Sequence, residues 1–150
     1  MVNVGDKKIT KRKATAIAQM YLGSEIIAHF KNDELITKKG PVFQTAIIAG
    51  IQAVKKTSDL IPMCHPLQIN GVDIDINIID TEHVEILCTV SMEGKTGVEM
   101  EALTGASVAG LTIYDMCKSI SQKMVLKEVR LLEKTGGKSH PNPFRREGLE

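Results

Sequence analysis

An α+β fold of the ferredoxin-like, split-βαβ kind is predicted by three features of the 150-residue sequence. Residues 73–78 and 84–92 alternate apolar and polar side chains with the period of two that is typical of half-buried strands. The polar turn between these stretches is short, which predicts an antiparallel hairpin. A strand-like stretch at 10–22 and another at 125–133 enclose the hairpin and the helices. We therefore expect a two-layer sandwich in which helices pack against an antiparallel sheet.

Helix and turn signals predict the remaining elements. Residues 24–32 suggest a short helix capped by Ser24. A proline suits the first turn of a helix over 41–58, and the two prolines within 59–66 forbid regular structure there. The stretch 98–123 predicts a long helix that carries almost no charge for about three turns, whereas a surface helix carries charge on every turn. The charges near its ends are therefore candidates for function.

Length and composition indicate one globular domain over residues 1–150, with a mobile tail from about residue 140. Apolar residues make up 43% of the chain and charged residues 25%, which argues against disorder. The net charge of +1 creates no field that would recruit nucleic acid or an anionic membrane. Aromatic residues are 3% of the chain, which leaves the predicted strands without a stacking platform for RNA bases. We therefore expect neither nucleic acid nor a membrane as a partner.

The cysteines and the N-terminal sequence indicate a cytoplasmic location. Three cysteines without CxxC spacing favour reduced thiols over a disulfide framework. The first residues contain no apolar region of a secretory signal, and no window approaches 18 uninterrupted apolar residues. Cys64 and His65 are adjacent and have no second ligand pair at zinc spacing, so no metal site is expected.

Four charged residues on the long helix are candidates for chemistry. Glu99 and Glu101 lie in its first turn, where acidic residues are also common because they interact favourably with the helix dipole. Asp115 and Lys118 are three positions apart, so they share a helix face and form either a solvated ion pair or an acid–base pair. The α-carbons of Glu101 and Asp115 lie about 21 Å apart along a straight helix. Either the glutamates are helix-end charges, or the site is shared between subunits.

Two loops add further candidates. His65 lies between two prolines, a position equally compatible with a structural and a binding role. Lys39 precedes a glycine and a helix start, which suits an anion site. Gly94-Lys95-Thr96 copies the end of a Walker A loop, but that motif requires a glycine at position 89, which is threonine. From the residues alone, the sequence indicates an acid–base enzyme that acts on a phosphorylated metabolite without a required cofactor.

Three long stretches carry more specific motifs: KKGPVFQTAIIAGIQAVKKTSDLIPMCHPL (38–67), GKTGVEMEALTGASVAGLTIYDMCK (94–118) and VRLLEKTGGKS (129–139). Together they closely resemble the cyclic pyranopterin monophosphate synthase family of molybdenum cofactor biosynthesis, over nearly the whole chain from Met1 to Ser139. The family converts a cyclised dihydro-GTP into cyclic pyranopterin monophosphate and releases pyrophosphate, so the resemblance implies a lyase with a nucleotide substrate. It also implies a homohexamer, a trimer of dimers with sites at the dimer interface. No redox cofactor is implied, and whether Mg²⁺ accompanies the triphosphate is left open.

The resemblance further implies roles for individual residues. Asp115 resembles the catalytic carboxylate, with Lys118 and Lys39 as its acid–base partners. The substrate-binding positions that it implies are Met63, Cys64, His65, Glu99, Met100, Glu101, Arg12 and Lys134. The alternative from another functional class is a non-catalytic ferredoxin-like module that binds a nucleotide and regulates a partner.

Overall fold

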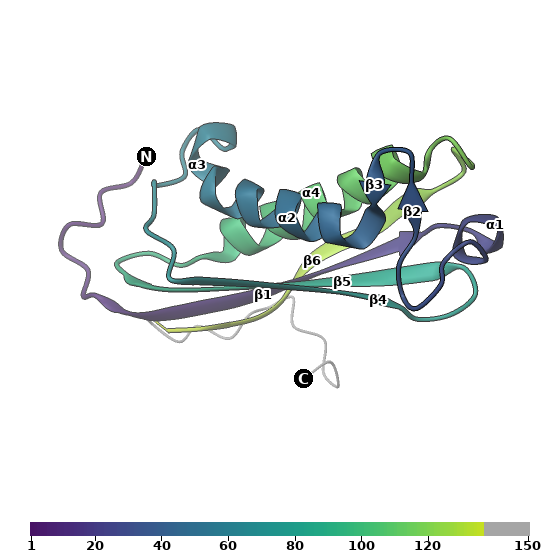
Figure 1. Cartoon of the computed structure of the whole chain (residues 1–150). Helices are drawn as coiled ribbons and strands as arrows, with labels where there is room; N and C mark the ends of the chain where they lie inside the picture. Colours follow the sequence, from purple (N-terminus) through teal and green to yellow (C-terminus); the bar gives the residue numbers. More distant parts are fainter. Residues whose placement is uncertain (137–150) are drawn as a thin grey trace.

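The computed structural model describes residues 1–136, which form a sheet with helices on one of its faces (Figure 1). The four-stranded sheet has the order β4-β5-β1-β6, and each neighbouring pair is antiparallel. Its strands are β1 (Thr10–Tyr21), β4 (Gly71–Ile78), β5 (His83–Gly94) and β6 (Val125–Thr135). The two-residue strands β2 (Ile36–Thr37) and β3 (Gly40–Pro41) pair with each other. The helices are α1 (Ser24–Ile27), α2 (Val42–Lys55), α3 (Thr57–Leu60) and α4 (Glu99–Cys117). This architecture confirms the predicted fold class.

The sheet follows directly from the alternation in the sequence. In the predicted hairpin, Ile74 lies opposite Cys88 and Ile76 opposite Ile86, and all four side chains are buried against the helices. Central strand β1 directs small side chains toward the same layer, because its buried positions there are mostly alanine. Small residues at the centre of the sheet let the helices approach closely, so the core is thin but continuous.

Helices α2 and α4 lie side by side over the sheet and touch where each carries a glycine. A Cβ atom on Gly50 would lie 2.5 Å from Ile74 Cδ1 and 3.0 Å from the Gly105 carbonyl oxygen. A Cβ atom on Gly105 would lie 2.7 Å from both Cys88 Sγ and Val54 Cγ2. The two glycines therefore set the separation between the helices, and α4 is held rigidly across the sheet.

Three predicted helix ends differ from the structure. Helix α1 ends at Ile27 and does not continue to residue 32. Ser24 does not cap α1: Gly23 holds the N-cap position with a φ of 89°, and no side-chain cap is formed. Helix α4 ends at Cys117 instead of continuing to 123. There the Cys117 carbonyl accepts the amides of Ile120 and Ser121, and the chain turns back. Met124, which follows this turn, is buried in the core just before β6 begins.

Other predictions hold in outline. The predicted helix over 41–58 consists of α2 followed by the short α3. The stretch 59–66 was predicted to lack regular structure, which is wrong for Asp59 and Leu60, because α3 includes them, and confirmed for 61–66. Among the helices of residues 1–136, none is long and apolar enough to cross a membrane. The predicted mobile tail lies outside the described residues, and the single domain over 1–150 stays a prediction because it includes them.

Candidate active site

Three charged side chains meet at the C-terminal end of α4. Asp115 lies in the last turn of the helix, and Lys118 follows it at the C-cap. Lys39 comes from the tight turn between β2 and β3, which Gly40 permits with a φ of 112°. Lys39 Nζ lies 2.9 Å from Asp115 Oδ2, and Lys118 Nζ lies 3.0 Å from Asp115 Oδ1. The carboxylate therefore bridges two ammonium groups, one on each oxygen.

The two lysines hold Asp115 in its ionised form. The hydrogen bond from Lys39 is the largest cause that lowers the pKa of Asp115, and the bond from Lys118 adds to it. Lys39 Nζ also donates to the Asp115 backbone carbonyl, at 3.3 Å, which fixes the lysine over the helix end. The Asp115 side chain is 54% exposed, so solvent reaches the cluster and a substrate could reach it as well. An exposed carboxylate with two adjacent ammonium groups can accept a proton and donate one to the same ligand.

A second polar group surrounds the N-terminal end of α4. Glu99 Oε1 lies 3.3 Å from Lys134 Nζ, which reaches it from β6. Arg12, from the beginning of β1, donates from Nε to the carbonyl of Gly94 at 3.3 Å. Gly94 ends the strand that precedes the helix, so Arg12 lies near the same end of the molecule. Met100 is exposed beside them.

Glu101 is the buried member of this second group. Its side chain is only 2% exposed, and Oε2 accepts a hydrogen bond from Cys64 Sγ at 3.5 Å. Burial raises the pKa of the Glu101 carboxyl, which favours the neutral acid. Burial also raises the pKa of the Cys64 thiol to about 11, and the nearby Glu101 adds to that rise. Among the residues that the structure describes, none bonds Glu101 Oε1.

The loop before β4 contributes Met63 and His65 to the same end. Met63 is 71% exposed, and its Sδ accepts a hydrogen bond from the Met1 amino group at 3.4 Å. His65 Nε2 lies 2.6 Å from the backbone carbonyl oxygen of Val2. Because a carbonyl oxygen only accepts, His65 Nε2 carries a hydrogen in this arrangement.

Sequence reasoning missed one cation at this end. Lys95 follows Gly94 in the loop before α4, and its Nζ donates to the carbonyl of Gly5 at 3.2 Å. The lysine was visible in the sequence only as part of a failed Walker A pattern. Its glycine-rich setting directly before a helix was the available signal, since such loops bring cations and amides to anions.

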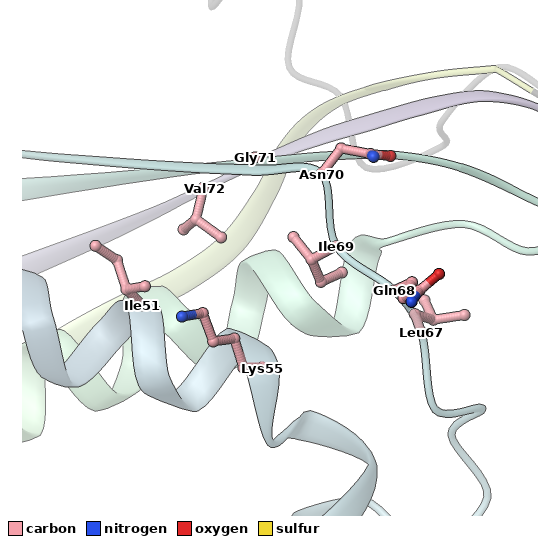
Figure 2. Close-up of a pocket in the computed structure, with 8 residues that line it drawn as sticks. All are labelled: Ile51, Lys55, Leu67, Gln68, Ile69, Asn70, Gly71 and Val72. Carbon is pink, nitrogen blue, oxygen red and sulfur yellow. The ribbon is translucent and has the colours of Figure 1, made fainter.

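A pocket of about 340 Å³ lies between α2 and the segment leading into β4. Figure 2 shows Ile51 of α2 and Val72 of β4 on facing sides of it, with Lys55 one helical turn further along. Leu67 and Ile69 complete its apolar walls. None of the predicted site residues lines this pocket, so it is separate from both charged groups.

Comparison with known proteins shows which family this chain resembles. Residues 1–137 match the model of a protein family described as the MoaC family. The chain belongs to the MoaC family. This match includes every predicted site residue and confirms the resemblance drawn from the three motifs.

Several proteins resemble this MoaC chain along most of its length. It is 48% identical over 138 residues to the cyclic pyranopterin monophosphate synthase of Xanthomonas campestris pv. campestris (strain 8004), covering 92% of this chain and 84% of that protein. It is 50% identical over 155 residues to molybdenum cofactor biosynthesis protein 1 of Dictyostelium discoideum, covering 93% of this chain and 25% of that protein. It is 52% identical over 143 residues to a molybdenum cofactor biosynthesis bifunctional protein of Synechocystis sp., covering 93% of this chain and 41% of that protein. The chain therefore spans less than half the length of the last two relatives.

The predicted site residues of this MoaC chain form two groups rather than one. The first contains Lys39, Asp115 and Lys118, and the second surrounds the beginning of α4. The helix between the groups is continuous from Glu99 to Cys117, so its two ends are about 27 Å apart by its rise per residue. Within the described residues, no set of three or more His, Cys, Asp or Glu side chains is placed to hold a metal ion. The arrangement could therefore support proton transfer at the C-terminal end of α4 and the binding of an anion by cations at its N-terminal end.

Proposed function

We propose that the protein is a cytoplasmic cyclic pyranopterin monophosphate synthase, a lyase of molybdenum cofactor biosynthesis. It would convert (8S)-3′,8-cyclo-7,8-dihydroguanosine 5′-triphosphate into cyclic pyranopterin phosphate and diphosphate. The observation that carries the proposal is the Asp115 carboxylate bridged by Lys39 and Lys118 within a MoaC-family chain. The name of the Xanthomonas relative, which this chain covers over 84% of its length, supports the same reaction.

The cluster at the end of α4 supplies the acid–base groups. Rebuilding a purine ring as a pterin needs several proton transfers and no net redox change. The ionised Asp115 would accept protons, while the ammonium groups of Lys39 and Lys118 would donate them. Each lysine is hydrogen-bonded to the carboxylate, so a proton that Asp115 has accepted can replace one that a lysine has donated. These three side chains are our proposed catalytic residues.

The group at the beginning of α4 would bind the substrate. When the cyclic phosphate closes, a sugar hydroxyl oxygen bonds to the α-phosphorus and the bond to the leaving diphosphate breaks. Negative charge accumulates on that leaving group, and fixed cations stabilise it. Arg12 and Lys134 are the cations placed here, both held by contacts beside the helix start. The remaining proposed binding positions are Met63, Cys64, His65, Glu99, Met100 and Glu101.

No resident cofactor is part of the proposal, and Mg²⁺ would enter only as a counterion of the substrate triphosphate. All the proposed steps are proton transfers or phosphoryl chemistry, which lysine, aspartate and arginine side chains can support.

The two groups would join in an assembly of several chains. A single substrate cannot span the length of α4, but an antiparallel second copy would bring the start of one α4 beside the end of the other. The exposed face of the helix suits such a contact, because it carries no charge between Glu101 and Asp115 and leaves Leu111 60% exposed. We therefore propose a homohexamer, a trimer of dimers with its sites at the dimer interfaces.

Turnover of the cyclised dihydro-GTP by purified protein tests the proposed reaction. We expect Asp115→Asn and Lys118→Ala to lower kcat by roughly 100-fold or more, because each removes a proton-transfer group. Asp73→Asn, which neutralises an exposed carboxylate on β4, is the matched control and should keep wild-type turnover.

If both variants at the end of α4 keep full turnover while their affinity for the nucleotide falls, the catalytic assignment is wrong. The alternative, a non-catalytic module that binds a nucleotide and regulates a partner, would hold if the wild-type protein bound the nucleotide without turning it over.

A further inference from the structure

The first nine residues form a segment that no predicted function uses. They have no regular secondary structure before β1 begins at Thr10. Figure 1 shows this purple segment at the same end of the molecule as α3. The segment therefore lies on the side where α4 starts and where the proposed substrate-binding residues gather.

Besides the contact of the Met1 amino group with Met63 Sδ, two backbone carbonyls hold this segment against the site. The oxygen of Val2 lies 2.6 Å from His65 Nε2, and the oxygen of Gly5 lies 3.2 Å from Lys95 Nζ. Local bonds shape the segment between these contacts, since Asn3 Oδ1 accepts the amide of Gly5 at 2.8 Å. Both contacts thus join a donor on the site to a neutral oxygen on the segment.

Phosphate oxygens would compete for these same donors. A hydrogen bond to an ionised acceptor is roughly twice as strong as one between neutral groups. His65 and Lys95 both gain by exchanging a peptide carbonyl for a phosphate oxygen. Three neighbouring cations, contributed by Arg12, Lys95 and Lys134, draw an anion to this end of the helix.

The segment itself is weakly held. Val2 is 75% exposed and Ile9 is also largely exposed, so little apolar area would be lost on its release. A segment held by few hydrogen bonds and little buried apolar surface belongs to the least stable part of a fold. Displacement therefore costs little compared with opening any strand of the sheet.

We propose that residues 1–5 form a displaceable strap whose carbonyls occupy His65 and Lys95 until phosphate oxygens replace them. Lys95 is then a substrate-binding residue. The strap and the substrate triphosphate compete for the same two donors, and the triphosphate binds by displacing the strap. That the natural ligand is the substrate triphosphate rests on the proposed function. That phosphate oxygens replace the carbonyls depends only on the two donors, His65 and Lys95.

Titration calorimetry with inorganic tripolyphosphate tests the strap on the full chain, on a variant lacking residues 2–5, on Lys95→Met and on the combination. We expect the strap deletion to tighten binding by roughly threefold or more, because it removes a competitor worth one or two hydrogen bonds. Lys95→Met should weaken binding about tenfold in both backgrounds, because it removes a charge-assisted bond. Lys127→Met is the matched control: this lysine contacts His83 at the other end of the sheet and should leave the affinity unchanged.

Hydrogen exchange gives a second readout that does not depend on any variant. Amides of residues 3–7 should exchange faster when tripolyphosphate is added, because the ligand releases the strap. Slower exchange would mean that the segment closes over the ligand, which contradicts displacement. Unchanged or weaker binding after the deletion would also overturn the competition, and full affinity in Lys95→Met would remove Lys95 from the site.

These outcomes are separable from those of the turnover assay. A chain with no synthase turnover but with tighter tripolyphosphate binding after the deletion would overturn the proposed function and support the strap. A chain with full turnover and no effect of the deletion on binding would support the proposed function and overturn the strap.

Discussion

Asp115 lies on the surface, where a single ion pair is usually worth little, yet its two oxygens are each engaged by a different lysine. We therefore propose a chemical role for this cluster instead of a stabilising one. A carboxylate kept ionised beside two proton donors is ready to act as a base without first losing its own proton. The contact with Lys39 matters most, because it is the largest cause of the lowered pKa.

Removal of Lys39 should therefore be visible in the titration of Asp115. In Lys39→Met, we expect the pKa of Asp115 to rise toward its ordinary value, because the strongest hydrogen bond to the ionised form is lost. Carbon NMR of the Asp115 carboxyl during an acid titration measures this shift. Lys38→Met, which removes the adjacent exposed lysine, is the matched control and should leave the titration unchanged. An unaltered Asp115 pKa in Lys39→Met would show that the contact is not maintained in solution.

The pKa of Glu101 is shifted in the opposite direction to that of Asp115. Its burial raises the pKa of the carboxyl, so the folded protein binds this proton more tightly than the unfolded chain does. The resulting stability is fully present below the ordinary glutamate pKa of 4.5 and is lost as pH rises through the folded-state value. Glu101→Gln keeps the shape and cannot ionise, so its free energy of unfolding should lack this loss.

Urea unfolding of the wild type and of Glu101→Gln across pH 4 to 9 measures the difference (about 1.4 kcal/mol for each unit of pKa shift). We expect the glutamine variant to gain stability relative to the wild type as pH rises above 4.5. Parallel stability curves for the two proteins would show that Glu101 titrates normally and that its burial is not maintained.

At the scale of elements, the crossing of α2 and α4 determines where both charged groups lie. Gly105→Ala should destabilise the fold by about 1–3 kcal/mol, because the added methyl meets Cys88 and Val54 in a packed core. The better helix propensity of alanine, worth about 1 kcal/mol, offsets only part of this cost. Gly110→Ala is the matched control, since its methyl meets the end of the flexible Leu126 side chain at 2.9 Å and should cost less. Thermal or urea unfolding compares the two; equal stabilities would mean that the helices separate easily.

The four strands of the main sheet were predictable from the sequence, whereas the short strands β2 and β3 and the C-terminal ends of α1 and α4 were not. Alternation over 73–78 and 84–92 predicts both the pairing and the buried face, because each face of a sheet has a distinct environment. The end of α4 is followed by Lys118 and not by a glycine or proline, so no local signal in the sequence marks it.

Most of the contacts among the predicted site residues could not be predicted from the sequence. Spacing along one helix pairs Asp115 with Lys118, but Lys39 is 76 positions away from Asp115 and reaches it only through the fold. The contact of Cys64 with Glu101 spans 37 positions in the same way. The role of residues 1–5 could not be predicted, because their contacts use backbone carbonyls, which every residue carries.

At the scale of the whole molecule, the length of α4 separates the residues proposed for proton transfer from those proposed for substrate binding. Lys39 meets Asp115 within one chain, so variants of these two residues disable the same end of the same helix. Complementation between chains must therefore combine variants from opposite ends of α4. The suitable pair is Asp115→Asn, at the end of the helix, and Lys134→Met, beside its beginning.

Co-assembly of these two inactive variants is the most direct test of a site shared between two chains. In a mixed dimer, one site would contain both substitutions and the other would contain neither. Random mixing in equal amounts should therefore restore about a quarter of wild-type turnover of the cyclised dihydro-GTP. No recovery in assemblies that contain both variants would contradict the account, because each chain would then carry a complete site of its own.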